Sequence, residues 1–356
     1  DSAIKEGFDN LTDGKDYDNL FESAQARAIA DWLVGMNISR LYSCLYQQNY
    51  SVGRVQTPTL AMIVKRDDEI ANYQKEKYYT VELSMNGFTL STDRIDDEVA
   101  AEQLLNLVGD KIEITDVIQK EKITKPDLPF DLTTLQRECN KYFGYSAKQT
   151  LDYAQSLYEK KLITYPRTDS QYLTEDMEQT ARNVVRQIYE KYQLTGPFDQ
   201  PEQPDVKKVM NNSKVTDHHA IIPTMELASC HLDELKSWEE KILFLIAVHT
   251  VMAMSKDHIY QETEIEVECQ GEIFKAKGKT VLQDGWKLFE NCFKNKDRMA
   301  IVDPDQEMKE RMPKVTQGQT FYAVAAEKTE HFTSPPKPYS EDTLLAAMET
   351  AGNKEF

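Results

Sequence analysis

One short string of the sequence combines a possible nucleophile with a cation at a useful spacing. It reads Leu-Ile-Thr-Tyr-Pro-Arg-Thr-Asp-Ser over residues 162–170. A tyrosine phenol can act as a covalent nucleophile, although its ordinary pKa of about 10 means that it needs help at neutral pH. Pro166 biases Tyr165 toward extended backbone, in which residues two apart face the same side. A guanidinium at Arg167 could therefore hold a phosphate oxygen beside the phenol of Tyr165.

Two further strings carry polar groups that suit phosphate chemistry. Residues 217–224 read Asp-His-His-Ala-Ile-Ile-Pro-Thr, and adjacent histidines point in different directions, so we do not expect them to chelate one metal ion together. A single imidazole can still donate a hydrogen bond to a phosphate or assist proton transfer. Residues 51–59 read Ser-Val-Gly-Arg-Val-Gln-Thr-Pro-Thr and lead into a helix N-terminus, where Arg54 and Gln56 can donate to phosphates or bases. They do not form a Walker A motif.

Each string also has a plain structural explanation, which the residues alone leave open. Tyr165 and Arg167 can be surface residues at the end of a β-hairpin, since 18 tyrosines are present and few tyrosines are nucleophiles. The two histidines can be an ordinary loop pair. Residues 119–168 hold nine Lys/Arg and six Asp/Glu, a net charge of +3, which fits either a solvated helix face or a nucleic-acid-binding helix–turn–helix around Gly144.

Composition narrows the class of protein. The chain has 356 residues, 40% of them hydrophobic, and a formal net charge of −18, which argues against uniform coating of nucleic acid but not against a local basic groove. The longest apolar run, residues 242–248, is far too short for a membrane-spanning helix. Five scattered cysteines predict buried or partly buried reduced thiols and no thiolate zinc site.

The elements that must position these strings follow from hydrophobic periodicity. We expect helices over residues 22–45 and 58–71, then a hairpin that turns at Asn86-Gly87, then strand character at residues 112–117. Residues 132–254 are predominantly helical, with Ser146 as a helix cap and an apolar helix over residues 235–254. Strands return around a turn at Gln270-Gly271 and again over residues 281–286 and 320–326, before a helix over residues 340–350.

This order predicts a multidomain α+β protein in which a helical domain is inserted into a β-rich domain. The β-rich domain is in turn flanked by two pieces of a further helical domain, because five separate units of this size would bury too little surface. The expected boundaries are a polar tail over 1–17, a first helical part over 18–74, β-rich parts over 75–125 and 259–332, the helical insert over 126–258, and a last helical part over 333–356.

Taken together and in this order, the three strings resemble type IA DNA topoisomerases, most closely the bacterial topoisomerase III branch. The resemblance also takes in Ala-Asp-Trp-Leu-Val-Gly-Met-Asn at residues 30–37 and Ser-Pro-Pro-Lys-Pro-Tyr-Ser-Glu at residues 334–341, and it covers nearly the whole chain from Asp16 onward.

The resemblance implies a mechanism and roles for particular residues. Tyr165 would attack single-stranded DNA to form a 5′-phosphotyrosyl link, a second strand would pass, and the released 3′-hydroxyl would reseal the break without ATP. Arg167 would stabilise the scissile phosphate and His218 would lie near it. The DNA-contacting residues would be Arg27, Asp31, Arg54, Gln56, Lys148, Thr168, Asp169, Ser170 and, as a weaker candidate, His219. Trp32 replaces an arginine found in some relatives, so we expect packing or base stacking there.

The resemblance also implies a fold and a setting. The family forms a toroid, in which the winged-helix-like insert carrying Tyr165 swings on the β-rich arch. A Toprim domain before residue 1 would bind the Mg²⁺ cofactor; its motifs are absent here, Asp1 is not a Met, and the 340–356 segment looks cut off. We therefore expect no metal bound by these residues, weak binding of single-stranded DNA, and no complete cleavage and religation by this polypeptide alone. The full protein would be a cytoplasmic, nucleoid-associated monomer without membrane contact.

Two other classes of function remain as alternatives. A non-catalytic winged-helix module for single-stranded nucleic acid fits the cationic segment but gives no reason for the Tyr165–Arg167 spacing. A purely structural scaffold predicts no DNA affinity at any salt concentration.

Overall fold

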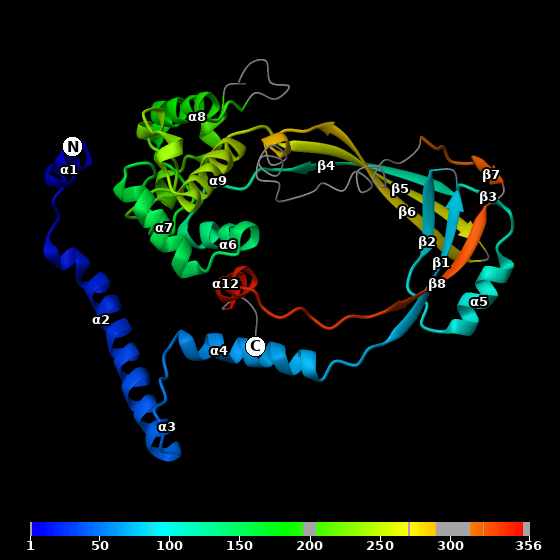
Figure 1. Cartoon of the computed structure of the whole chain (residues 1–356), viewed down its shortest axis with the longest axis horizontal. Coiled ribbons are helices and arrows are strands. Elements are labelled where there is room, and N and C mark those ends of the chain that lie inside the picture. Colours follow the sequence, from blue (N-terminus) through cyan, green and yellow to red (C-terminus); the bar gives the residue numbers. More distant parts are fainter. Residues whose placement is uncertain are drawn as a thin grey trace. The chain divides into compact units, whose positions relative to one another are not determined.

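The computed structural model describes residues 2–85, 87–194, 204–269, 271–289, 314–322 and 324–351 (Figure 1). It separates into two compact units. The first comprises residues 1–74 and 335–339, and the second comprises residues 75–334 and 340–356. Within the described residues, no helix is both long enough and apolar enough to cross a bilayer.

The first unit is helical. It contains α1 (Ser2–Asp9), α2 (Asp18–Trp32), a π-helical segment (Leu33–Ile38), α3 (Ser39–Tyr46) and α4 (Gln56–Ala71). The predicted helices are confirmed, although α2 begins four residues earlier and Pro58 lies in the first turn of α4, where its missing N–H costs nothing. Residues 335–339 join this unit, since Arg66 donates to the Lys337 carbonyl at 2.9 Å and lies over the Tyr339 ring.

The second unit contains a six-stranded antiparallel sheet. Its strands are β1 (Lys77–Met85), β2 (Phe88–Thr92), β4 (Asp116–Thr124), β5 (His258–Cys269), β6 (Glu272–Gln283) and β8 (Ala325–Phe332), in the order β4-β5-β6-β2-β1-β8. A small second sheet pairs β3 (Lys111–Glu113) with β7 (Thr320–Tyr322). Helix α5 (Glu98–Leu107) packs with this β-rich part (Figure 1).

The predicted hairpins form, but two predicted strands are corrected, and one of them, expected over 320–326, divides between β7 and β8, which lie in different sheets. Met85 pairs with Phe88, and Gly87 has a φ of +99°, which glycine adopts readily; Asn86 and Gln270 lie outside the described residues. The separate strand expected over 281–286 is wrong. Residues 281–283 complete β6, and the chain then turns at Gly285, whose φ of +56° brings it against the Asp257 carbonyl.

The insert between β4 and β5 has its own core. It contains α6 (Leu132–Phe143), α7 (Ala147–Glu159), α8 (Glu178–Tyr192) and α9 (Ser237–Ala253), with short 3₁₀ turns between α8 and α9. Ser146 caps α7 as predicted, and Gly144 ends α6 with a φ of +68°, so the helix–turn–helix outline is confirmed. A winged helix is not confirmed, because the described residues of the insert pair only through isolated β-bridges.

The insert and the β-rich part bury separate hydrophobic cores. The insert core includes Leu135, Leu157, Ile188 and most of the inward residues of α9, whereas Val81, Leu83, Leu90, Ile265 and Phe274 lie in the core of the sheet. Cys139 is buried, but Cys44 is exposed, which corrects the expectation that every thiol is at least partly buried; Cys292 lies outside the described residues.

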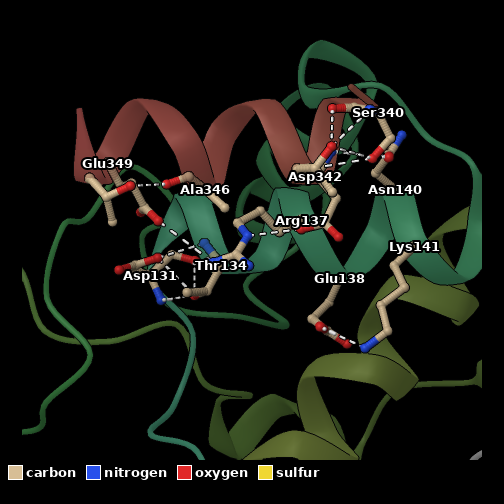
Figure 2. A network of polar contacts seen from close by, with 12 residues as sticks. Asp131, Thr134, Arg137, Glu138, Asn140, Lys141, Ser340, Asp342, Ala346 and Glu349 are labelled. Atoms are coloured by element: carbon tan, nitrogen blue, oxygen red, sulfur yellow. Dashed lines mark hydrogen bonds and ion pairs between the residues drawn. The ribbon is translucent and has the colours of Figure 1, made fainter. Parts of the chain in front are cut away.

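A C-terminal helix, α12 (Glu341–Thr350), lies along α6 (Figures 1 and 2). Arg137 of α6 forms ion pairs with Asp342 at 2.9 Å and Glu349 at 3.6 Å, and the Asn140 amide oxygen accepts the Asp342 N–H. The contact is therefore polar and partly exposed, unlike the two apolar cores.

Candidate active site

The chain that carries Tyr165 leaves α7 through a fixed turn. Lys161 adopts a left-handed conformation with a φ of +60°, and the Leu162 N–H donates to the Leu157 carbonyl, which ends the helix. Ile163 then forms a β-bridge with Pro223, and Thr164 exchanges hydrogen bonds with Ile222. The segment before Tyr165 is consequently held in extended form on both sides.

Burial alternates along the six residues that follow. Pro166, Thr168 and Ser170 are buried, whereas Tyr165 is half-buried and Arg167 and Asp169 are exposed. This is the two-residue period of an extended chain with one face against the insert. Tyr165 and Arg167 therefore lie on the same, outward face of the segment.

Tyr165 is flanked by two other rings. The His218 ring centroid lies 4.4 Å away with the planes tilted by 43°, and the Tyr158 ring of α7 meets it edge-on at 5.3 Å. Both spacings fall in the range of favourable aromatic contacts. The structure thus brings Tyr165 and His218 together from strings 53 residues apart in the chain.

Two hydroxyl groups of this segment hold the loop over residues 214–218, which carries His218, in place. Thr168 Oγ1 donates to the His218 carbonyl at 3.0 Å, and Ser170 Oγ donates to the Lys214 carbonyl at 2.8 Å. Asp169 accepts from Thr216 at 3.3 Å. Because Thr168 and Ser170 are buried and bonded to backbone, their side chains position His218, and direct contact with DNA through these hydroxyls stays a prediction.

The two histidines have different surroundings. His218 is exposed next to Tyr165, whereas the Nδ1 atom of His219 lies 2.9 Å from the Ala220 carbonyl. Partial burial lowers the pKa of His219 below its ordinary value, with a smaller opposing effect from the Ala220 hydrogen bond. His219 is therefore kept neutral near pH 7, and His218 is the better placed of the two for acid–base or phosphate chemistry.

A buried carboxylate that sequence reasoning missed fixes the end of α7. Glu239 is 1% exposed and accepts hydrogen bonds from Lys160 Nζ at 2.6 Å, Ser156 Oγ at 2.9 Å and the Lys236 N–H at 3.0 Å. Burial raises the pKa of Glu239, but these three hydrogen bonds outweigh it and lower the pKa overall. Glu239 alone in the sequence gives no signal for this site, since its side-chain partners Ser156 and Lys160 are 83 and 79 residues away.

Two cations of the insert that were predicted to meet DNA are exposed, at different places along the chain. Arg167 is exposed, and no carboxylate in the part of the chain that the structure describes forms an ion pair with it. Lys148 is exposed in the first turn of α7, one residue after Ala147, whose N–H donates to Glu341. An anionic ligand would meet Arg167 without having to displace a salt bridge from it.

The remaining predicted DNA-contacting residues lie in the first unit. Arg54 donates to both Asp31 carboxylate oxygens, from Nε at 2.6 Å and from Nη2 at 3.4 Å. The Arg54 hydrogen bond, aided by the charges of Arg54 and Arg27, lowers the pKa of Asp31. Gln56 donates to Ser51 Oγ at 2.9 Å, and Trp32 is 63% exposed. The structure thus brings Arg27, Asp31 and Arg54 into one cluster.

The described residues do not supply the Mg²⁺ site that the sequence resemblance implies. Across the described ranges, no three His, Cys, Asp or Glu side chains gather in a way that could hold a metal ion.

Comparison with known proteins identifies the family. A family model described as DNA topoisomerase matches residues 15–352. DNA topoisomerase 3 of Bacillus licheniformis is 38% identical over 366 residues, which cover 98% of this chain and 48% of that protein. DNA topoisomerase 3 of Bacillus subtilis strain 168 is 38% identical over 362 residues, with 98% and 49% covered.

A solved structure supports the same family. Full-length topoisomerase I from Thermotoga maritima superposes with a TM-score of 0.69 at 25% identity, over 92% of this chain and 53% of that one. The chain belongs to the type IA DNA topoisomerase family. Within it, the chain is topoisomerase III-like, as the names of its Bacillus relatives indicate. It spans about half the length of the curated relatives that it matches.

Proposed function

We propose that this chain carries the nucleophile and the strand-binding groups of a type IA topoisomerase. The phenolic oxygen of Tyr165 attacks phosphorus in single-stranded DNA, the bond from phosphorus to the 3′ oxygen breaks, and the 3′ oxygen leaves as a hydroxyl. The break reseals by the reverse reaction after another strand has passed. Each step exchanges one phosphodiester bond for another, so no nucleotide hydrolysis is required.

The roles of the neighbouring residues follow from their positions. Arg167 on the same face as Tyr165 holds a non-bridging phosphate oxygen and offsets the charge that builds up there during attack. His218, in ring contact with Tyr165, donates a hydrogen bond to the same phosphate. Thr168 and Ser170 hold His218 in place through hydrogen bonds to the backbone of its loop. Glu239 fixes the end of α7 through hydrogen bonds with Ser156 and Lys160.

The finer architecture is part of the proposal. The insert acts as a winged-helix-like domain on a β-rich arch of a toroidal molecule, with domain boundaries near residues 17, 74, 125, 258 and 332. The protein works as a cytoplasmic, nucleoid-associated monomer on single-stranded DNA, and the Mg²⁺ that the family generally uses is bound outside the described residues. Arg27, Asp31, Arg54, Gln56 and Lys148 contact the strand.

The observation that carries the proposal is the outward-facing Tyr165–Arg167 pair with His218 packed against the tyrosine. It is tested in the full-length protein with a single-stranded oligonucleotide labelled at its 3′ end, stopped with denaturant. The label should stay with the wild-type protein and fall to background for Tyr165→Phe, because the nucleophilic oxygen is gone.

The matched control is Tyr158→Phe, which removes the neighbouring phenol and keeps the ring packing. It should retain covalent attachment. Label that stays attached to Tyr165→Phe would contradict the proposal, whereas DNA binding without attachment by the wild-type protein would favour the non-catalytic nucleic-acid module.

A further inference from the structure

Three tyrosines form an exposed aromatic row in the first unit. Tyr42 and Tyr46 lie one turn apart on α3 with ring centroids 6.0 Å apart and planes within 7°, and Tyr50 meets Tyr46 edge-on at 5.6 Å. Their exposed fractions are 43%, 60% and 43%. The three rings are thus ordered against one another while a large part of each remains open to solvent.

The row is anchored to the loop that carries Arg54 and Gln56. Ser43 Oγ accepts the Tyr50 N–H at 3.0 Å, and Ser39 Oγ accepts the Val52 N–H at 2.9 Å, so residues 50–52 run back along α3. Arg54, two residues further on, reaches Asp31 of α2. At about 1.5 Å per helical residue, Tyr46 lies roughly 20 Å from the Asp31–Arg54 pair along the helix axis, a span of a few nucleotides.

The charge of this part of the chain favours an anionic partner. Residues 24–66 contain five Lys/Arg and a single acidic residue, Asp31, a net charge of +4 in a chain whose total is −18. A cationic surface that follows a backbone, combined with exposed rings, is the usual combination in proteins that bind single-stranded nucleic acid. A purely apolar protein partner would not account for the positive net charge of residues 24–66.

We propose that Tyr42, Tyr46 and Tyr50 are a base-stacking site for single-stranded DNA, with the phosphates of the same strand directed to the arginine-bearing loop. This site rests on the proposed function for the identity of its ligand. It adds to the phosphate contacts of the strand a base-stacking contact, which the phosphate-binding residues do not provide. Tyr46 is the central residue, because it contacts both of the other rings.

The test separates stacking from charge. Affinity of the full-length protein for a fluorescent 12-nucleotide thymidine oligonucleotide is measured over a range of salt concentrations. Tyr46→Leu should weaken binding about tenfold, in the range of one lost base stack, with the slope of log affinity against log salt unchanged, whereas Tyr46→Phe should bind like the wild type. Arg54→Gln should instead reduce the slope, by about 0.7 for one phosphate contact on a single strand.

An abasic oligonucleotide of the same length keeps the phosphates and removes the bases. Wild-type protein and Tyr46→Leu should bind it equally. Equal binding of the thymidine oligonucleotide by both would overturn the proposal, as would a fall in the salt slope for Tyr46→Leu. If Tyr46→Leu loses helicity by circular dichroism, Tyr42→Leu takes its place with the same expected result.

A protein segment covering the row would give a different outcome that also overturns the proposal. In that case Tyr46→Leu would lower the melting temperature of the full-length protein without changing DNA affinity. Failure of the proposed function is distinguishable, because it appears as absence of the Tyr165 adduct, which this binding assay does not measure.

Discussion

Arg167 and Tyr165 share a face of the chain, yet they are expected to contribute to different parts of the reaction. Arg167 is exposed and two residues beyond the proposed nucleophile, so its guanidinium can meet the phosphate that the phenol is proposed to attack. A cation placed there stabilises the charge that develops in the transition state more than it stabilises the bound strand. The two contributions can be separated by measuring cleavage and binding in parallel.

We predict that Arg167→Ala slows single-turnover DNA cleavage about 10²- to 10³-fold, in the range seen when one such donor is removed. Affinity for the uncleaved oligonucleotide should change by less than about threefold, since one exposed phosphate contact contributes modestly. Arg167→Lys should recover part of the rate but not all, because an ammonium group lacks the bidentate geometry. Equal losses in affinity and in rate would show that Arg167 only binds the strand.

For single residues, the sequence predicts which residue types could carry the chemistry better than it predicts which other residues they contact. The Tyr165–Arg167 spacing and Pro166 are enough to predict an extended, two-faced segment. The positions of the Thr168 and Ser170 hydroxyls depend on the 214–218 loop, and the buried carboxylate of Glu239 depends on Ser156 and Lys160 at the end of α7. Such contacts form between strings distant in sequence, so local pattern gives no signal for them.

Among the elements, α9 carries a histidine in an unusual environment. His249 stacks on Phe130 with ring centroids 3.8 Å apart, and its Nδ1 atom is buried with no hydrogen-bond partner among the described residues. It borders a cavity of about 510 Å³ that Arg137, Glu138 and Lys141 of α6 also line. Burial lowers the pKa of His249 to about 4.

This environment predicts a specific loss of stability in acid. Above the ordinary histidine pKa of about 6.5 both the folded and the unfolded chain hold a neutral His249, and there is no penalty. As the pH falls from there toward 4, the unfolded chain takes up a proton that the fold excludes. The free energy of unfolding should therefore drop by about 2 kcal/mol from this residue between pH 7 and pH 5.

Urea unfolding at the two pH values measures the effect, with His249→Phe as the comparison. The variant keeps an aromatic ring against Phe130 and cannot be protonated, so its pH-dependent loss should be smaller than that of the wild type by the amount given above. The same loss in both proteins would mean that His249 gains a partner when it is protonated.

Element types with a strong local signal were predictable from the sequence. The Ser146 cap, the Gly144 turn and the alternation of Tyr79, Val81 and Leu83 each act through neighbouring residues, and each is found in the structure. Helix α5 lay outside the predicted elements although six of its ten residues are apolar; it is short and follows an acidic run. The π-helical turn at Leu33–Ile38 was missed because its hydrophobic pattern differs little from that of an α-helix.

On the scale of the whole molecule, the two units differ in what stabilises them. Helices α2, α3 and α4 of the first unit bury no residue, whereas the second unit holds both hydrophobic cores. Helices of 15 or 16 residues without a buried face are marginal in water. The first unit should therefore open far more readily than the second.

Hydrogen exchange followed by mass spectrometry on this polypeptide tests that difference. Peptides from α2 and α4 should exchange at least about a hundredfold faster than peptides from α9, since the ratio reports the difference in opening free energy. The strands β1 and β5 should behave like α9. Protection of α2 and α4 equal to that of α9 would show that the first unit has stabilising contacts that burial does not reveal.

The discontinuous order of helical and β-rich segments could also be predicted, because it needs only the change of hydrophobic period along the chain. The order of strands within the sheet could not. Leu83 pairs with Ala326, more than 240 residues later, and no turn connects β1 to β8. Such a pairing is decided by the fit of whole surfaces, which local sequence does not specify.

The proposed function depends on covalent chemistry at one phenol, that of Tyr165. The most direct measurement is mass spectrometry of the denatured and digested adduct between the full-length protein and single-stranded DNA. We predict that the modified peptide contains Tyr165 and carries nucleotides through their 5′ phosphate. An adduct on any other residue, or one joined through a 3′ phosphate, would contradict the account.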